Sequence, residues 1–303
     1  MPRASDPTVD PVRARTLIEE ACPELRPAEP GHLGRGWDHD VYTSDGRVFR
    51  FPRHQASADA LELEMRVLPW LAPQLPTAIP IPLWRGSLDR DKGWSFVGHR
   101  FIPGTTVCDA ELCEDARALL APRLANFVRA LHQVSVDGAP AALPMDELGR
   151  LDAEKRSRST RSELAGWQRE GLLPYDTVVG LFRKLDDWPG PAVDEPLVVV
   201  HADLHGRNLL VTPDGRLSGV IDWVDIHRGN RAVDLATAYI VLPPRARETF
   251  FKTYGGVDSR TLLRARFRAI DHSTRTLAGA IERRDEAFVR ASQRALIESA
   301  EGD

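Results

Sequence analysis

The sequence predicts an α+β chain of two lobes, a small β-rich lobe over residues 1–101 and a larger, mostly helical lobe over residues 102–303. In the first third of the chain, short extended segments alternate with Gly, Pro and Asp–Gly turns. From Asp109 onward, apolar residues recur at the helical spacing of i, i+3 and i+4, except in residues 197–223. The chain has 303 residues, of which 42% are hydrophobic, and this is enough for a core in each lobe.

The first lobe is predicted to begin with a helix and three strands. Asp10 followed by Pro11 is typical of a helix N-terminus, and this helix runs to about Glu20. Residues 30–53 then predict a strand, a glycine-rich turn, a second strand, a turn at Asp45–Gly46 and a third strand.

A second helix and two further extended segments complete the predicted first lobe. Ser57 can cap a helix that runs to about Leu71. Residues 77–86 and 94–104 are extended, with breaks at Pro and Gly. A short link near residue 102 then leads into the second lobe.

The second lobe is predicted to be helical on both sides of a strand and a β-hairpin. Residues 116–134 and the residues after 230 show helical periodicity. Residues 197–200 are typical of a buried strand, and Asp214–Gly215 predicts the turn of a hairpin.

Charge and composition exclude several classes of protein. The formal net charge is −4 and the isoelectric point is near 6.2, so the chain offers no basic field for nucleic acid. No apolar run approaches the roughly 18 residues of a membrane span, and the N-terminus lacks the apolar core of a signal peptide. Cys22, Cys108 and Cys113 form no CxxC pair, which favours reduced thiols and a cytoplasmic location.

Three polar residues are predicted to converge at one end of the hairpin. Antiparallel pairing about Asp214–Gly215 places Asn208 opposite residue 220 or 221, with Asp222 one step beyond. Asp203 lies five residues before Asn208, across a tight loop. Clustered carboxylates repel unless a cation neutralises them, and Mg²⁺ accepts one or two carboxylates together with phosphate oxygens. The remaining Asp is free to accept a proton.

The run "HADLHGRN" followed by "GVIDW" resembles the catalytic segment of the aminoglycoside phosphotransferase family, whose members share the protein-kinase fold. The resemblance implies that Asp203 is the catalytic aspartate, that Asn208 is a metal ligand and that Asp222 is the principal metal ligand. It implies Mg²⁺ as cofactor, and ATP or GTP as co-substrate. In "GNRAVDLA" it further implies that Asp234 braces the catalytic loop, although Asn230 departs from the Asp usual in the family.

The helix predicted from Ser57 supports this interpretation independently of the hairpin. Glu64 shares one face of the helix with Leu61 and Leu68, and an acid in an apolar stripe needs a partner. Arg50 is the predicted partner, because in "VFRFPR" its side chain points opposite to those of its Phe neighbours.

By the resemblance, this ion pair grips the nucleotide phosphates. Family members usually carry Lys where this chain has Arg50, and Arg neutralises phosphate with a different fork geometry. The alternative is that Arg50 and Glu64 form a purely structural pair, while Arg53 or Lys92 reaches the phosphates.

Two further segments resemble nucleotide-binding parts of the family. "LGRGWDHD", with Gly34 and Gly36, is similar to the nucleotide-positioning loop, whose backbone amides approach phosphate. "FVGHRFIPG" is similar to the linker between the lobes, where the adenine edge pairs with backbone groups that fall on Arg100 and Ile102. His99 takes the position that flanks the adenine pocket.

The predicted function is therefore that of a small-molecule kinase, which transfers the γ-phosphate of a nucleoside triphosphate to a hydroxyl group. An aminoglycoside-type antibiotic is the favoured acceptor, because residues 138–196 hold 11 acidic against 8 basic residues and Asp271 can join them in a negative wall. A macrolide, or a metabolite of the kind phosphorylated by other kinases of this fold, is the alternative. The sequence leaves open the choice of ATP or GTP and the oligomeric state.

Two other classes of function use the same residues. His201, Asp203 and His205 form an H-x-D-x-H run that suits a zinc metallohydrolase, although a role for His201 in bracing the loop is favoured. A nucleotide-binding pseudokinase is disfavoured by the intact Asp and Asn residues. The roles of His205, Asp225 and His227 are left open.

Overall fold

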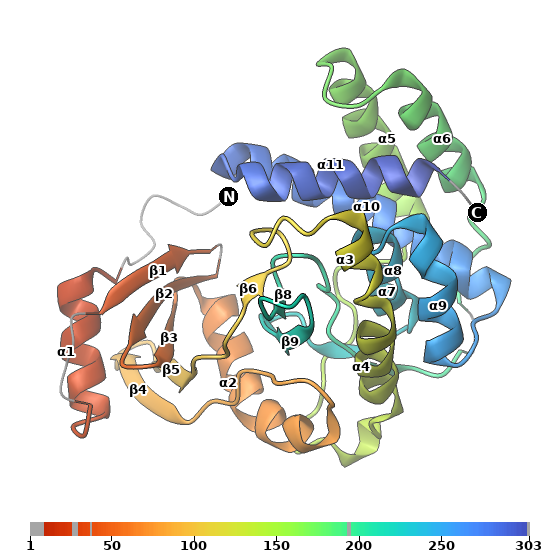
Figure 1. The fold of residues 1–303 in the computed structure, drawn as a ribbon. Helices are drawn as coiled ribbons and strands as arrows, with labels where there is room; N and C mark the ends of the chain where they lie inside the picture. Colours follow the sequence, from red (N-terminus) through yellow and green to blue (C-terminus); the bar gives the residue numbers. More distant parts are fainter. Residues whose placement is uncertain (1–8, 26–29, 37, 193–194, 302–303) are drawn as a thin grey trace.

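The computed structural model describes residues 9–25, 30–36, 38–192 and 195–301. It shows an antiparallel sheet in the first third of the chain and a larger helical part after it, joined through a small hairpin in the middle (Figure 1). The predicted α+β, two-lobed arrangement is confirmed. Within the described residues, no helix is both long enough and apolar enough to cross a membrane.

The first lobe is built on a five-stranded sheet with the strand order β1-β2-β3-β5-β4. Helix α1 lies on its outer side, and helix α2 lies between the sheet and the helical lobe (Figure 1). The elements are α1 (Pro11–Ala21), β1 (Gly31–Arg35), β2 (His39–Ser44), β3 (Arg47–Pro52), α2 (Gln55–Leu71), the 3₁₀ turn η1 (Ala72–Gln74), β4 (Trp84–Asp89) and β5 (Trp94–Arg100).

The helix starts show how local sequence sets the element boundaries. Asp10 caps α1 as predicted, because its carboxylate accepts a hydrogen bond from the Arg13 N–H at 2.8 Å. The prediction that Ser57 caps α2 was wrong. His54 is the cap, and its ring nitrogen Nδ1 accepts from the Ser57 N–H while Ser57 Oγ accepts from the His54 N–H, each at 3.2 Å.

The second lobe surrounds the predicted hairpin with helices. Its strands are β6 (Thr105–Thr106), β7 (Val198–Val200), β8 (Leu209–Val211), β9 (Leu217–Val220) and β10 (His227–Gly229). Its helices are α3 (Glu114–Ala118), α4 (Ala121–Gln133), η2 (Val136–Gly138), α5 (Ala153–Arg169), α6 (Tyr175–Asp186), α7 (Ala232–Leu235), α8 (Thr237–Ile240), α9 (Pro244–Tyr254), α10 (Ser259–Arg283) and α11 (Glu286–Ala300).

One helical segment is broken where the sequence predicted continuity. Residues 116–134 divide between α3 and α4 at Leu119 and Leu120. Pro122 lies in the first turn of α4, where its missing N–H costs nothing, whereas inside a continuous helix it would clash with the carbonyl of Ala118.

The hairpin has the predicted register. Leu209 pairs with Val220, and the Ile221 N–H donates to the Asn208 carbonyl at 2.9 Å. Strand β6, just after β5, adds a third strand on β8. The Val220 N–H donates to the Ala78 carbonyl at 2.9 Å, so the segment after α2 is tied to the same hairpin.

Helix α2 joins the apolar cores of the two lobes. Ala58 packs with the sheet core of the first lobe, whereas Val67, Leu68 and Leu71 pack in the core that contains α4 and the hairpin. Glu64 lies between these two groups and is buried. The helix therefore holds one carboxylate at a fixed position where the lobes meet.

Candidate functional site

The loop between β7 and β8 is held in a strained conformation. Ala202 has φ 71° and Asp222, just past β9, has φ 63°, both in the left-handed region that is unfavourable for residues other than Gly. The buried carboxylate of Asp234 accepts from the N–H groups of His201 at 2.9 Å and Ala202 at 2.7 Å. The predicted bracing role of Asp234 is confirmed.

His201 links the loop to the end of the hairpin. Its Nε2–H donates to the Ile221 carbonyl at 3.1 Å, its Nδ1 accepts from the Asp203 N–H at 3.3 Å, and its ring packs on Trp223. These contacts hold Asp203 and Asp222 relative to one another, as expected for a bracing residue.

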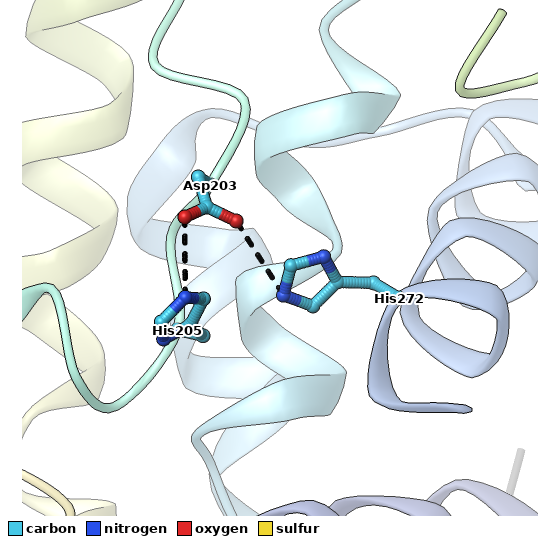
Figure 2. Close-up of side chains that lie close together, drawn as sticks. All are labelled: Asp203, His205 and His272. Carbon is cyan, nitrogen blue, oxygen red and sulfur yellow. Dashed lines mark ion pairs between the residues drawn. The ribbon is translucent and has the colours of Figure 1, made fainter. Parts of the chain in front are cut away.

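Asp203 lies at the tip of the braced loop. Its Oδ2 accepts from the Asn208 side-chain amide at 2.8 Å and contacts His205 Nε2 at 3.2 Å, and its Oδ1 lies 3.8 Å from His272 Nε2 (Figure 2). Burial alone would raise the pKa of Asp203, but His205 and then His272 outweigh it and hold this pKa well below its usual range. Asp203 is therefore an ionised hydrogen-bond acceptor at neutral pH.

Asp222 is the second carboxylate of the site. Its pKa is raised to about 7 by burial, with Asp203 and Glu64 adding negative charge and Arg50 opposing the rise. Arg50 Nη2 lies 3.5 Å from Asp222 Oδ1, so a residue of the first lobe contacts the end of the hairpin. Asn208 lies at that same end, because its carbonyl accepts from the Ile221 N–H.

The predicted ion pair between Arg50 and Glu64 is confirmed. Arg50 donates to both carboxylate oxygens, at 2.6 and 3.2 Å, and the two side chains are 9% and 1% exposed. Burial opposes the charge of Arg50, yet Glu64 and then Asp222 raise the pKa of the guanidinium. Arg50 Nη2 also lies 3.4 Å from His39 Nδ1.

The two alternative cations of the first lobe lie elsewhere. Arg53 donates to the Gly36 carbonyl at 2.9 Å, beside the glycine turn. Lys92 lies 3.8 Å from Asp89 and over the ring of Trp94, in the turn between β4 and β5. Neither of these contacts involves Asp222.

The remaining predicted residues lie along the sheet and the linker. Gly34 is in β1 opposite Val41, and the Gly36 N–H donates to the His39 carbonyl at 2.9 Å in the turn to β2. Arg100 ends β5, and its carbonyl accepts from His99 Nδ1 at 2.8 Å. Ile102 follows, packed against Gly219 of β9. Their nucleotide contacts stay predictions.

A cavity of about 310 Å³ opens beside Asp203 on the side of the helical lobe. It is lined by residues of α10, by the N-terminal end of α11, by residues 148–156 and by the catalytic-loop candidates Asp203 and His205. The prediction that Asp271 joins an acidic wall here was wrong. Asp271 is fully buried and accepts hydrogen bonds from Arg156 at 3.1 Å, Arg275 at 3.0 Å and Thr160 at 3.0 Å.

A family model described as the phosphotransferase enzyme family matches residues 32–269. The chain belongs to this family. The match spans the sheet, the braced loop, the hairpin and the first 11 residues of α10. It therefore includes Arg50, Glu64, Asp203, Asn208 and Asp222, and ends just before Asp271 and His272. The resemblance inferred from the sequence is confirmed, and the protein is an enzyme that transfers phosphate.

Curated relatives and a solved structure agree with the family. The chain is 29% identical over 213 residues to an aminoglycoside 3'-phosphotransferase of Streptomyces ribosidificus, covering 66% of this chain and 75% of the relative. It is 31% identical over 209 residues to a viomycin phosphotransferase of Streptomyces vinaceus, covering 66% and 69%. The GDP complex of wild-type aminoglycoside 2'-phosphotransferase-IIIa superposes with a TM-score of 0.70 over 96% of this chain and 98% of that one, at 23% identity, and this likeness shows the fold.

The donor atoms at the hairpin end of this phosphotransferase fit a hard dication. The Asn208 amide nitrogen is used by Asp203, which leaves the amide oxygen to coordinate. Burial, and then the negative charges of Asp203 and Glu64, destabilise the ionised carboxylate of Asp222, and a dication would reverse this. One carboxylate and one amide oxygen, completed by phosphate oxygens and water, are a typical Mg²⁺ environment.

The zinc-hydrolase interpretation is not supported by the geometry. His201 donates its Nε2–H to Ile221, so the predicted trio is not assembled. Asp203, His205 and His272 do lie within 4.8 Å of one another. However, His205 Nδ1 accepts from the Arg207 N–H at 3.2 Å, so Nε2, the atom that faces Asp203, carries a proton and cannot bind a metal.

Residues that the sequence did not assign also have defined positions. Asp225 binds Arg150 at 2.8 Å, at the edge of the cavity. His227 Nδ1 donates to the Asp225 carbonyl at 2.8 Å within the turn before β10. His272 of α10 was not predicted at all, and it faces Asp203 from a helix about 70 residues further along the chain.

Asp234→Asn should lower both stability and turnover of the enzyme. The amide offers one acceptor oxygen where the carboxylate offers two, so one buried N–H of the loop loses a charge-assisted hydrogen bond. We expect the free energy of unfolding to fall by about 2–3 kcal/mol, measured in urea, with a larger fractional loss in kcat than in nucleotide affinity. Asp187→Asn, at an exposed helix end, is the control, and equal behaviour of the two variants would contradict the bracing role.

Proposed function

We propose that the enzyme transfers the γ-phosphate of a nucleoside triphosphate to a hydroxyl group of an antibiotic-type small molecule. The observation that carries the proposal is the position of Asp203, which lies between the acceptor-sized cavity and the hairpin end with Asn208 and Asp222. The names of the two Streptomyces relatives, which act on aminoglycosides and viomycin, support an acceptor of this kind. The GDP in the structural neighbour supports a nucleotide co-substrate.

Within this proposal, residues 1–101 form the nucleotide-binding lobe and residues 102–303 the catalytic and acceptor-binding lobe. Arg50, held by Glu64, lies against the α- and β-phosphates, and the backbone of Gly34 and Gly36 approaches the phosphates from the sheet. The backbone groups of Arg100 and Ile102 face the adenine or guanine edge. Asn208 and Asp222 would hold Mg²⁺, which would neutralise the negative charge of the phosphates.

The chemistry of the step follows from the state of Asp203. The acceptor oxygen forms a bond to the γ-phosphorus, the bond from that phosphorus to the β–γ bridging oxygen breaks, and the nucleoside diphosphate leaves. The hydroxyl proton passes to Asp203. Since its low pKa makes Asp203 a weak base, its main contribution is to orient the hydroxyl as a hydrogen-bond acceptor, with proton transfer late in the step.

A nucleotide-coupled screen against hydroxylated antibiotics and metabolites tests the proposal. We expect Mg²⁺-dependent formation of nucleoside diphosphate that requires one class of acceptor. The screen includes aminoglycosides, viomycin, macrolides and small hydroxylated metabolites. Zinc-dependent hydrolysis without phosphate transfer would contradict the proposal and favour a hydrolase.

Glu64→Gln should weaken nucleotide binding more than it affects the acceptor. The neutral amide leaves Arg50 buried beside a weaker partner, so the guanidinium turns further toward Asp222 and away from the phosphates. We expect the Kd for Mg-nucleotide to rise about tenfold or more by calorimetry. Glu62→Gln, on the exposed side of the same helix and paired with Arg85, is the control. Unchanged nucleotide affinity with reduced stability would make the pair purely structural.

A further inference from the structure

Most of the charged side chains that line the cavity beside Asp203 are cations. Five guanidinium side chains contribute to its wall, those of Arg150, Arg156, Arg268, Arg275 and Arg283. Among the residues that the structure describes, only two carboxylates line the cavity, those of Asp203 and Asp225. An acceptor with several amines would therefore meet more positive than negative groups in this cavity.

The acids near the cavity are already engaged. Asp225 binds Arg150, and Asp146 binds the same guanidinium at 2.7 Å. Asp271 lies behind the wall, where Arg156, Arg268 and Arg275 share its single charge. Among the described lining residues, this leaves Asp203 as the one carboxylate that forms no ion pair with an arginine, and it is needed for the reacting hydroxyl.

Arg275 is the arginine best placed to meet a ligand. Its side chain is 42% exposed, Nε is the atom that binds Asp271, and Nη2 makes one long contact of 3.5 Å with Ser159 Oγ. The surroundings are crowded with positive charge: burial lowers the pKa of Arg268, about two helical turns earlier, to about 10. The charges of Arg150 and Arg156 contribute to the fall, while Asp271 and Asp203 oppose it. An anion in the cavity would relieve this crowding of like charges.

His272 offers a second contact for a ligand in the same cavity, in addition to Arg275. The residue is 5% exposed, and its Nε2 has no hydrogen-bond partner among the described residues, which is costly for a buried polar atom. Figure 2 shows this atom directed at Asp203, but the 3.8 Å to Oδ1 is too long for a hydrogen bond. A hydroxyl oxygen beside this pair, about 2.8 Å from each atom, can donate to Asp203 and accept from His272.

His272 and Arg275 lie one helical turn apart. His272 and Arg275 are three residues apart on α10, so they share a face with about 5–6 Å between their Cβ atoms. A molecule whose hydroxyl lies between Asp203 and His272 therefore presents its neighbouring atoms to Arg275.

We propose that the acceptor carries an anionic group, a carboxylate or a phosphate. This group lies about 5–6 Å, the spacing of one helical turn, from the hydroxyl that is phosphorylated. The hydroxyl lies between Asp203 and His272, and the anion binds Arg275. This inference rests on the proposed function and narrows its acceptor to anionic hydroxylated compounds, in place of the polycation predicted from the sequence.

Polyols of one chain length and different charge test the inference by calorimetry. Gluconate carries one negative charge, sorbitol carries no charge, and glucamine carries one positive charge. Sorbitol 6-phosphate distinguishes a preference for phosphate from a preference for carboxylate. With the nucleotide site filled by a non-hydrolysable Mg-nucleotide, we expect gluconate or sorbitol 6-phosphate to bind about tenfold or more tightly than sorbitol, and glucamine least tightly. Gluconate and sorbitol 6-phosphate both binding no more tightly than sorbitol, or glucamine binding most tightly, would overturn the inference.

Variants of α10 assign the effect to Arg275. Arg275→Gln should remove the advantage of the anion, Arg275→Lys should keep most of it, and Arg260→Gln, an exposed arginine on the same helix that binds Pro189, should leave it unchanged. Melting temperatures should be similar, because Asp271 keeps Arg156 and Thr160 as partners in every variant. An anion preference that survives in Arg275→Gln would overturn the assignment.

His272→Gln tests the hydroxyl position separately. We expect about tenfold or greater loss in kcat for the acceptor found in the screen, with unchanged Kd for Mg-nucleotide. Unchanged kcat would overturn the placement of the hydroxyl. Phosphorylation of an aminoglycoside with the same KM in wild type and Arg275→Gln would contradict the anionic acceptor but not the proposed kinase activity. Absence of Mg-nucleotide binding would contradict the proposed function itself.

Discussion

Asp203→Asn is expected to reduce turnover by about 10²–10⁴-fold while leaving nucleotide binding nearly intact. The amide keeps an oxygen for the hydrogen bonds from Asn208 and His205, so the loop should stay folded. It presents N–H donors to the acceptor hydroxyl, which then has no group to receive its proton. Single-turnover kinetics with saturating Mg-nucleotide measure the effect on the chemical step.

The matched control for this variant is Asp214→Asn. Asp214 lies in the exposed turn of the same hairpin, where its carboxylate contacts Arg216 and Thr212 away from the cavity. We expect its turnover to equal that of the wild type. If Asp203→Asn retained activity within about tenfold of wild type, Asp203 would have no part in proton transfer or in orientation.

Asp222→Asn is expected to remove most Mg²⁺-dependent nucleotide binding, and to do so more completely than Asn208→Ala. A carboxylate contributes a full charge to a hard dication, whereas an amide contributes only a dipole. The loss in affinity should exceed the roughly 10–100-fold typical for residues that merely orient a metal ligand. Calorimetric titration with nucleotide, with and without Mg²⁺, measures these affinities. Equal Mg-nucleotide affinity in wild type and both variants would refute the metal assignment.

The stability of Asp222→Asn shows separately whether Asp222 is needed for folding. Because the pKa of Asp222 is raised to about 7, its ionisation opposes folding in the metal-free protein. This destabilising effect is fully present above pH 7 and is absent below about pH 4. Asp222→Asn should therefore be at least as stable as wild type at pH 8 without metal, with the difference shrinking as the pH falls below 7. Thermal melts across this range measure it, and a variant less stable than wild type at pH 8 would show that Asp222 is needed for folding.

The parts of the site that follow local rules could be predicted from the sequence. The turn at Asp214–Gly215 determines the register of β8 and β9, and this register alone brings Asn208 and Asp222 together. Helical spacing alone places Glu64 among leucines, and the strand alternation of β3 turns Arg50 toward it. In each case the deciding contact lies within a few residues along one element or across one turn.

The departures from prediction come from choices that local rules do not decide. His54 and Ser57 both offer a side chain that can cap α2, and serine is the commoner cap, but the histidine ring reaches the Ser57 N–H. The break before α4 depends on one residue, Pro122, within an otherwise uniform helical pattern.

The acceptor side of the site could not be predicted because it depends on tertiary packing. Helix α10 is polar on most of its buried surface, with Arg268, Asp271 and His272 all less than 6% exposed, so its periodicity does not say which residues face the cavity. Asp271 pairs with Arg156 of α5, more than 100 residues earlier in the chain. Counting charges over residues 138–196 therefore gave a wall of the wrong sign.

Phosphorus NMR of the reaction product tests the central claim most directly. With wild-type enzyme, a nucleoside triphosphate and the acceptor found in the screen, the account predicts a new phosphomonoester signal coupled to a carbinol proton of the acceptor. Asp203→Asn should not form this signal on the same timescale, although it still binds Mg-nucleotide. Release of inorganic phosphate alone, or equal phosphomonoester formation by both proteins, would contradict the account.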